Sequence, residues 1–541
     1  MRMNYTKWIL LCTAIASIAM AGVTRVPSGP VTGKWLTGDS VIVEAGAFVP
    51  VDGELSIDCG VGIFFEGVGR FEVEGSLLVE GNALQPVNIY AVDGWRGFRL
   101  SGNHWHSFHY VNILSDAGLP RQCVELRDGG LDMRNCNFAA AENCLRVVSG
   151  ELHAIENSLF TSKLYSKVVE LSGMNGFPSE DCKLAPGNIF RDNFLKCDVA
   201  PLQPGDPIDP FSVTSGLWVD YCTNICMNSN EITVRAPLTV VGARFGNTPD
   251  FGDQSWDLDE TVVYAESFTQ MAIGVLNEVN GDLDVSKMTI TVRGAEGYSS
   301  SCFFAARTAY IRVNSTTTIM GSPLDIFFNT SGAGRIDANY LLKWAEAGSS
   351  LLDEDPSVPP LASTEFLTSF DNLTVNLGDS IWEENPQFAM NGTWGDWNNR
   401  VEIAAFFALT RFSPCIDRGD PDLGHDPDNT RLDIGRFYFD QASSPVDPHP
   451  SIVDKSSMLA AYPNPFNPST ILPIEIAGPG LLKVTVWDVL GRVVWEANQP
   501  VYSAGLQNVH FKASGLASGT YIAQAEFDGQ IVGNQRLSLI K

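Results

Sequence analysis

The fold of this chain is decided by two short stretches, LDMRNCNF (residues 131–138) and LHAIENSLF (residues 152–160). They align with Asn135 over Asn157, a step of roughly 22 residues, and VNI at 111–113 lies roughly 23 residues before the first of them. Such periods predict a solenoid, because one coil is too small to cover its own apolar face and stacked coils bury a continuous core. Asparagine suits the corner of a coil, since it tolerates left-handed backbone and can hydrogen-bond to the next asparagine.

The length of the chain limits the number of coils. A coil of roughly 22 residues allows at most about nineteen coils before the C-terminal module. Stretches rich in proline and aspartate at residues 200–212 and 345–362 have the composition of loops that leave the coil. We therefore expect about twelve coils.

The beginning of the repetitive region resembles a known family. VTGKWLTGDSVIVEAGAFVPVDGELSIDCGVGIFFEGVGRFEVEGSLLVEGNALQPVNIYA (residues 31–91) and WRGFRLSGN (residues 95–103) are similar to the N-terminal coils of pectin-lyase-like proteins. The family's motif positions are occupied here by Val49, Pro50, Gly53, Leu55, Ile57, Gly60, Phe65, Val73, Gly75, Leu77, Gly81, Trp95 and Gly97. The resemblance implies an all-β, right-handed parallel β-helix over residues 22–440. It implies little about function, because lyases, hydrolases, adhesins and inert surface proteins share this fold.

The end of this region is rich in carboxylates. SPCIDRGDPDLGHDPDNTRLDIGRFYFD (residues 413–440) resembles the closing segment of secreted β-helices. Alternating aspartates among turn residues are able to cage a hard cation, so calcium is a candidate cofactor, although the twelve-residue helix–loop–helix pattern is absent. The alternative is a polar cap whose carboxylates accept hydrogen bonds from backbone N–H groups. The candidate ligands are Asp420, Asp422, Asp426, Asp428 and Asp433.

A separate module is expected at the C-terminus. Residues 441–458 (QASSPVDPHPSIVDKSSM) have the composition of an exposed linker. Residues 459–541 alternate apolar and polar positions in short runs between glycine-containing turns, which predicts a small antiparallel β-sandwich.

The C-terminal module also resembles a family. AYPNPFNPST (461–470), VWDVLGRVV (486–494), SAGLQNVHF (503–511), ASGLASGTYIAQ (513–524) and LSLIK (537–541) are similar, in this order, to the type A sorting domain of the bacterial type IX secretion system. This implies an Ig-like domain that the secretion machinery recognises and that is usually removed as the cargo is released or fixed to surface polysaccharide. The alternative is an ordinary Ig-like accessory module. The motif residues are Tyr462, Pro463, Asn464, Pro465, Phe466, Asn467, Pro468, Gly491, Arg492, Gly519 and Tyr521.

The N-terminus has the features of an export signal. Arg2 and Lys7 precede an apolar run that ends at Ala19-Met20-Ala21, a small-x-small cleavage pattern. The run holds about thirteen residues, whereas a bilayer span needs about 20. We interpret residues 1–21 as a signal peptide rather than a membrane anchor, and expect a secreted or cell-surface protein with no transmembrane span after cleavage.

Charge and cysteine content narrow the range of partners. The formal net charge is −28, and it lies before residue 459, so a nucleic acid partner is not expected. Cys222 and Cys226 lack zinc-pair spacing and are expected to be buried thiols or a local disulfide. The mature chain keeps ten cysteines: Cys59, Cys123, Cys136, Cys144, Cys182, Cys197, Cys222, Cys226, Cys302 and Cys415.

No known catalytic pairing of this fold is visible. The chain contains no Asp-Asp and no His-Gly dipeptide, and its basic residues have no fixed spacing to the carboxylates. Catalytic residues therefore stay unassigned. The acidic cluster Asp250, Asp253, Asp257, Asp259 and Glu260 is expected to be a solvated loop.

The stretch GNHWHSFHYVN carries three histidines and a tryptophan. His104 and His106 fall on one face of a strand, with Trp105 opposite and His109 beyond. Packing between coils is the favoured interpretation, and metal binding or the stacking of a sugar on Trp105 are the alternatives.

Two classes of function remain. The first is a non-catalytic secreted or surface protein that adheres to, or binds, extracellular glycans. The second is a polysaccharide lyase or glycoside hydrolase that acts in the groove of the β-helix. The absence of known catalytic pairings favours the first.

Overall fold

The computed structural model divides the chain into two compact units. One comprises Met1–Glu384 with Ile434–Arg436, and the other Asn385–Asp433 with Phe437–Lys541. The structure describes residues 23–540 except 93, 115–118, 165–166, 175–187, 202–211, 223–224, 247–254, 279–280, 296–297, 299, 322–325, 332, 346–373, 391–392, 442–455, 459–460, 462–463, 465, 467–468, 477–479, 502–504 and 514. The predicted signal peptide at residues 1–21 and most of the predicted linker lie outside the described residues.

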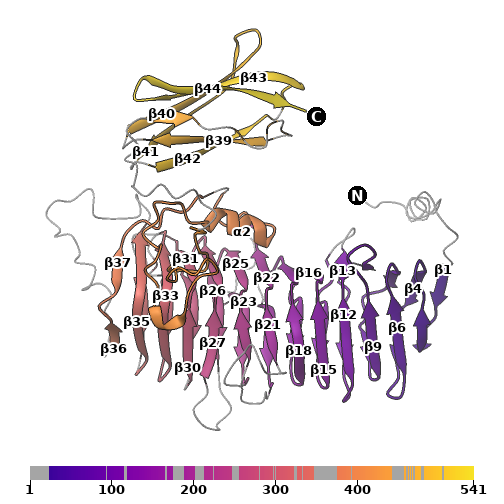
Figure 1. Cartoon of the computed structure of the whole chain (residues 1–541). Coiled ribbons are helices and arrows are strands. Elements are labelled where there is room, and N and C mark those ends of the chain that lie inside the picture. The colour runs from indigo at the N-terminus through magenta and orange to yellow at the C-terminus, as the bar shows by residue number, and fades with distance from the viewer. Residues whose placement is uncertain are drawn as a thin grey trace. The chain divides into compact units, whose positions relative to one another are not determined.

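The first unit is a parallel β-helix (Figure 1). Its strands pair in parallel with the equivalent strands of the neighbouring coils and form three columns. Figure 1 shows them stacked in chain order, from indigo to orange. The third column is a sheet of twelve strands among the described residues, in line with the expected number of coils.

The first column contains β3 (Gly33–Trp35), β6 (Glu54–Asp58), β9 (Ser76–Glu80), β12 (Trp105–His109), β15 (Gly130–Arg134), β18 (Glu151–Glu156), β21 (Ile189–Arg191), β24 (Cys226–Asn228), β27 (Ser255–Asp259) and β30 (Asp282–Ser286). The second contains β1 (Val23–Val26), β4 (Ser40–Glu44), β7 (Gly62–Glu66), β10 (Val87–Ala91), β13 (Val111–Leu114), β16 (Asn137–Ala140), β19 (Leu159–Ser162), β22 (Phe194–Asp198), β25 (Glu231–Ala236), β28 (Val262–Ser267) and β31 (Thr289–Arg293). The third contains β2 (Gly29–Pro30), β5 (Ala47–Val49), β8 (Phe71–Val73), β11 (Phe98–Leu100), β14 (Val124–Leu126), β17 (Leu145–Val147), β20 (Lys167–Ser172), β23 (Val213–Asp220), β26 (Thr239–Phe245), β29 (Ala272–Asn277), β32 (Ser301–Ala305) and β34 (Ile326–Thr330). The last coils are formed by β33 (Tyr310–Met320), β35 (Arg335–Ala345), β36 (Thr374–Leu377) and β37 (Ile381–Glu383).

A left-handed residue turns the chain from the first column into the second. Asn135 and Asn157 have φ values of 55° and 50°, which confirms the predicted left-handed backbone of asparagine at this corner. A single residue in the left-handed region bends the strand without interrupting the ladder, and asparagine adopts that region at low cost. The same corner is occupied in other coils by Tyr110, Asp192, Ser229, Glu260, Lys287, Ser315 and Tyr340.

The register between coils agrees with most of the repeat alignment. Phe138 pairs with Phe160, as the alignment predicts, and their rings lie 6.1 Å apart in the core. One predicted step is wrong: Asn112 pairs with Asn137 rather than with Asn135, so that coil is slightly longer than the repeat implied. The additional length lies between β13 and β15.

The short segment Ile434–Arg436 belongs to the first unit. The N–H of Gly435 donates to the carbonyl of Ser315 at 2.8 Å, and the hydroxyl of Thr317 donates to the carbonyl of Ile434 at 3.2 Å. Gly435 has a φ of 106°, and a Cβ there would lie 2.9 Å from the Thr317 hydroxyl oxygen. Glycine is therefore required where this segment contacts the last coils.

The described part of the second unit contains the predicted antiparallel sandwich and two short helical segments. A three-stranded sheet of β38 (Ser457–Met458), β39 (Ser469–Ile476) and β42 (Gly505–Lys512) accompanies a four-stranded sheet of β41 (Val493–Val501), β40 (Gly480–Asp488), β43 (Gly519–Phe527) and β44 (Gln530–Leu539). Leu472, Val484 and Phe511 belong to one apolar core. Before the sandwich lie α2 (Arg400–Phe407) and the 3-10 helix η1 (Pro421–Leu423).

Candidate functional site

A column of glycines lies where successive coils enter the first column of strands. Gly102, Gly129, Gly150 and Gly173 have φ values of 87°, 84°, 123° and 64°. A Cβ on Gly129 would lie 2.2 Å from the carbonyl oxygen of His104, and one on Gly150 would lie 2.6 Å from the carbonyl oxygen of Gly129. Only glycine fits both the backbone conformation and this close stacking. The column therefore has no side chains, and the surface above it is hollow.

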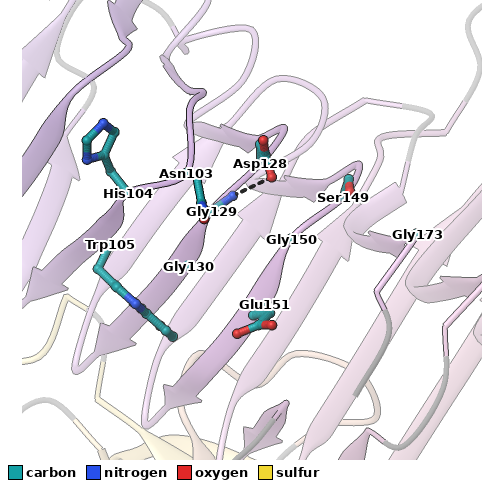
Figure 2. Close-up of a pocket in the computed structure, with 10 residues that line it drawn as sticks. All are labelled: Asn103, His104, Trp105, Asp128, Gly129, Gly130, Ser149, Gly150, Glu151 and Gly173. Atoms are coloured by element: carbon teal, nitrogen blue, oxygen red, sulfur yellow. Dashed lines mark hydrogen bonds between the residues drawn. The ribbon is translucent and has the colours of Figure 1, made fainter. Parts of the chain in front are cut away.

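This hollow is a pocket of about 250 Å³. Figure 2 shows its side chains, which come from the turns before β12, β15 and β18 and from the first residues of these strands. The lining consists of Asn103, His104, Trp105, Asp128, Gly129, Gly130, Ser149, Gly150, Glu151 and Gly173. We call it the Trp105 pocket.

Trp105 is the aromatic wall of the pocket. It pairs with Gly130 of the next coil, and a Cβ on Gly130 would lie 2.2 Å from the indole ring. The indole therefore rests on the backbone of Gly130, and Figure 2 shows it extending from its strand toward that of Glu151. The imidazole of His153 meets the ring edge-on, with the centroids 6.2 Å apart. Trp105 nevertheless stays 52% exposed, so it offers a supported, accessible aromatic surface.

The charged groups of the pocket are carboxylates. Oδ1 of Asp128 accepts the N–H of Gly129 at 2.9 Å, and Glu151 is exposed beside the indole. Within the described part of the chain, neither carboxylate forms a salt bridge. The lining contains no lysine or arginine. Among the described residues, the pocket thus combines an aromatic surface with two carboxylates that have no ion-pair partner.

The two faces of β12 explain the histidine pattern. His106 is 1% exposed and lies in the core between Leu77 and Leu131 of the adjacent coils. Burial, with a smaller contribution from His104, lowers the pKa of His106 to about 4. Packing between coils therefore accounts for His106 but not for Trp105, which points outward. His104 precedes the strand and lines the pocket.

The five aspartates predicted to bind calcium lie in the closing segment, where four of them accept backbone N–H groups. Asp433 accepts from Asp417 at 2.8 Å and from Phe439 at 2.7 Å. Asp426 accepts from Asp433 at 2.8 Å. Asp428 accepts from Thr430 and Gln441, and Asp420 accepts from Asp422. These hydrogen bonds are of the kind that the polar-cap alternative predicts.

Burial raises the pKa of the Asp433 carboxyl to about 7, against the opposing effect of its two N–H donors. Asp422 is exposed. Among the described residues, no group of three or more acidic, histidine or cysteine side chains is arranged to hold a metal ion. The calcium site stays a prediction.

The second acidic cluster is not a solvated loop where it is described. Asp257 and Asp259 belong to β27, and burial raises the pKa of Asp259. Asp250 and Asp253 lie outside the described residues.

The neighbouring strands β30, β33 and β35 carry what we call the charge ladder: Asp282, Asp284, Tyr310, Arg312, Arg335 and Asp337. Arg312 bonds to Asp282 and Asp284, and Arg335 bonds to Asp337. The sequence did not reveal this ladder, because its members meet only through the register of the coils.

Of the two alternatives for Cys222 and Cys226, the local disulfide is wrong, and the buried thiol is found for Cys222 alone. Cys226 is disulfide-bonded, whereas Cys222 is a free, buried thiol whose pKa is raised to about 12 by burial. The two therefore do not pair with each other. Cys182 lies outside the described residues.

Several predicted sorting residues have clear structural roles in the sandwich. The side chain of Asn464 donates to the carbonyl of Arg536 at 2.8 Å and accepts the N–H of Ser538 at 2.9 Å. Phe466 is 2% exposed in the core. The hydroxyl of Tyr521, in β43, donates to the carbonyl of Ala517 at 2.7 Å.

The turn at Gly491 and Arg492 is held by Asp488, whose Oδ1 accepts the N–H groups of Leu490 and Arg492. Gly491 has a φ of 76°. Gly519 is the first residue of β43. Tyr462, Pro463, Pro465, Asn467 and Pro468 lie outside the described residues.

Comparison with known proteins identifies this module. Residues 460–537 match the family described as "Secretion system C-terminal sorting domain". No curated protein matches the chain. Among the described residues, no helix has the length and apolarity needed to cross a lipid bilayer. The chain therefore carries, after its parallel β-helix, a C-terminal sorting domain that directs it to secretion or to the cell surface through the type IX secretion system.

Proposed function

We propose that this exported β-helix is a non-catalytic glycan-binding protein and that the Trp105 pocket is its binding site. The observation that carries the proposal is the exposed indole on the outer surface of the solenoid, 52% accessible and supported from below by Gly130. Large apolar side chains are normally buried, so an exposed tryptophan that lines a pocket is a typical recognition surface. The apolar face of a pyranose ring matches a flat indole, and the surrounding Asn103, Asp128, Ser149 and Glu151 supply polar partners for its hydroxyls.

The exported location supports this proposal. A protein that the type IX system delivers outside the cell or to its surface meets extracellular polysaccharides directly. In this account, the β-helix within residues 22–440 binds the ligand, and the predicted linker at residues 441–458 connects it to a module that serves only in export. The linker ends before β38 (Ser457–Met458), which already pairs with β39 of the sandwich. These domain limits, the signal peptide at residues 1–21 and the removal of the sorting domain are parts of the proposal.

The test is a glycan array probed with the full-length secreted chain. We expect at least one class of oligosaccharide to be retained. Trp105→Ala should weaken retention by about five- to 150-fold, if a sugar ring gains as much from the indole as a nucleic acid base gains from an aromatic side chain, roughly 1–3 kcal/mol. The control is Tyr298→Ala, since Tyr298 is also an exposed aromatic residue, at 42%, but does not line the pocket. Equal retention by Trp105→Ala and the wild type would contradict the proposal.

A second function, glycoside hydrolysis, is favoured by one observation: Asp128 and Glu151 line the same pocket as Trp105. Glycosidases use two carboxylates that flank the scissile bond. Release of new reducing ends from a retained glycan, abolished by Glu151→Gln, would establish this function and reject the non-catalytic one. Retention without release supports the binding protein.

A further inference from the structure

The acidic character of the Trp105 pocket sets the class of glycan that it accepts. We propose that the pocket selects glycans with free amino groups, such as polyglucosamine, and discriminates against polyuronates. This inference rests on the proposed function, since it takes the pocket to be a glycan site. It adds a preference for the charge of the ligand. This preference depends on the carboxylates of the pocket, whereas stacking against the sugar depends on Trp105.

Which charged ligand the pocket prefers depends on the charges close to it more than on the net charge of the chain. At physiological ionic strength the screening length is about 8 Å, so distant acidic residues contribute little. The ionisable lining residues are Asp128, Glu151 and His104. An ammonium group in the pocket gains from both carboxylates, whereas a uronate is repelled by them.

Among the described residues, the arginines of the neighbouring coils form their salt bridges with carboxylates other than Asp128 and Glu151, and four of them share Glu125. Glu125, in β14, is 1% exposed and belongs to the third column of strands. Its carboxylate lies within 4.0 Å of the guanidinium nitrogens of four arginines: Arg70, Arg99, Arg127 and Arg146. Arg127 is next to Asp128 in the chain, yet its Nε lies 2.5 Å from Glu125.

The indole adds to the preference for a cation. An ammonium group near the face of tryptophan is attracted by the ring quadrupole, by roughly 0.5–1 kcal/mol at an exposed site. An aminated sugar can use its apolar ring face and its ammonium group at the same time. A neutral sugar can use only its ring face. A uronate carries a carboxylate instead of an ammonium group, and the acidic pocket repels it.

A lysine-containing peptide is the competing ligand, because its ammonium group would meet the same charges. Sites that enclose a lone alkylammonium group surround it with several aromatic rings. Among the residues that line this pocket, Trp105 is the one large aromatic ring, and it forms an open wall. This geometry favours a flat sugar ring over an alkyl chain.

The experiment is calorimetry on the full-length chain with three hexasaccharides of glucosamine, N-acetylglucosamine and galacturonate. We expect the glucosamine hexamer to bind about tenfold more tightly than the acetylated one, and the galacturonate hexamer to bind most weakly. Glu151→Gln and Asp128→Asn should each lower the ratio of the two affinities, glucosamine over acetylated hexamer, by about two- to fivefold. This is the effect expected for the loss of one exposed ion pair. Raising the salt concentration should reduce it further.

Gly130→Ala separates stacking from charge. Its Cβ would displace the indole from its position without removing the tryptophan or either carboxylate. We expect this variant to weaken the binding of the glucosamine and acetylated hexamers by the same factor and so to keep the preference between them. The Tyr298→Ala variant is the matched control, with unchanged affinities.

The outcomes distinguish the two proposals. Equal binding of the glucosamine and acetylated hexamers, lost in Trp105→Ala, overturns the charge selection and leaves the glycan site intact. Preferred binding of galacturonate, or displacement of the glucosamine hexamer by hexalysine at equal concentration, also overturns the selection. Failure of all three hexamers to bind, together with an array on which nothing is retained, overturns the glycan site itself.

Discussion

The Trp105 pocket and the charge ladder are two outward surfaces of one β-helix, with similar side chains in different arrangements. In the ladder, each aspartate forms an ion pair with Arg312 or Arg335. Both guanidinium groups also lie against the ring of Tyr310, at 4.8 and 4.7 Å from its centroid. In the pocket, Asp128 and Glu151 have no salt bridge among the described residues, and Trp105 has an accessible face. The comparison teaches that composition alone does not mark a binding site on this solenoid. The difference lies in whether the stacked coils supply partners for each other's side chains.

The largest expected effect comes from the glycine column that keeps the pocket hollow. Gly129→Ala adds a Cβ 2.2 Å from a carbonyl oxygen at a residue with a φ of 84°. We expect unfolding in urea to show a loss of about 3 kcal/mol or more, from left-handed strain and the clash together. Gly38→Ala is the matched control, because Gly38 has a φ of 86° but no atom near its Cβ position. Its loss should be about 1 kcal/mol. Equal losses in the two variants would show that the close stacking is unimportant.

The next effect concerns the core below the pocket and depends on pH. His106 has a folded pKa of about 4, below its ordinary value of 6.5. As the pH falls, His106 is therefore protonated in the unfolded chain before it is protonated in the folded one. The free energy of unfolding falls as the pH drops from about 6.5 to about 4. The loss should reach roughly 3 kcal/mol, at 1.36 kcal/mol per pKa unit.

His106→Leu should remove this dependence, since leucine already occupies the stacked positions at residues 77 and 131. The measurement is urea unfolding at a series of pH values between 4 and 7. His425→Leu, at an exposed histidine, should keep the wild-type slope. If the stability of His106→Leu fell with pH as steeply as that of the wild type, His106 would not be the source of the pH dependence.

The smallest effect is expected in the charge ladder. Arg312→Met removes the bonds to Asp282 and Asp284, but these side chains are 39–45% exposed. Exposed ion pairs contribute about 0–1 kcal/mol, so the stability should change by less than about 1 kcal/mol and by less still at high salt. Glycan binding should be unaffected, because the accessible indole lies elsewhere. A loss of binding in this variant would show that the ladder, rather than the pocket, contacts the ligand.

Sequence periodicity predicted the solenoid but only part of the candidate site. The pairing of Phe138 with Phe160 and the left-handed asparagines were predictable, because the coil length is constant there. The outward orientation of Trp105 could also have been predicted. Phe108 must face the core, and alternation along β12 then places His106 inside and Trp105 outside. Alternation alone placed Trp105 opposite His106 but left open which of the two faces points into the core.

The pocket itself was not predictable from the sequence. The glycines at 102, 129, 150 and 173 are spaced irregularly, so their alignment depends on coil lengths that only the register supplies. The capture of the arginines by Glu125 likewise joins residues from separate coils, apart from Arg127. The sorting domain was predicted more fully, because its motifs are local turns and caps, such as Asp488 beneath Gly491 and Arg492.

The central claim is that the exposed indole of Trp105 is the glycan-binding surface. A crystal structure of the full-length chain soaked with the glucosamine hexamer tests it most directly. The account predicts electron density for a sugar ring parallel to the indole, with an amino group directed at Asp128 or Glu151. Density for the oligosaccharide along the charge ladder or on the sandwich, with Trp105 left bare, would contradict the account.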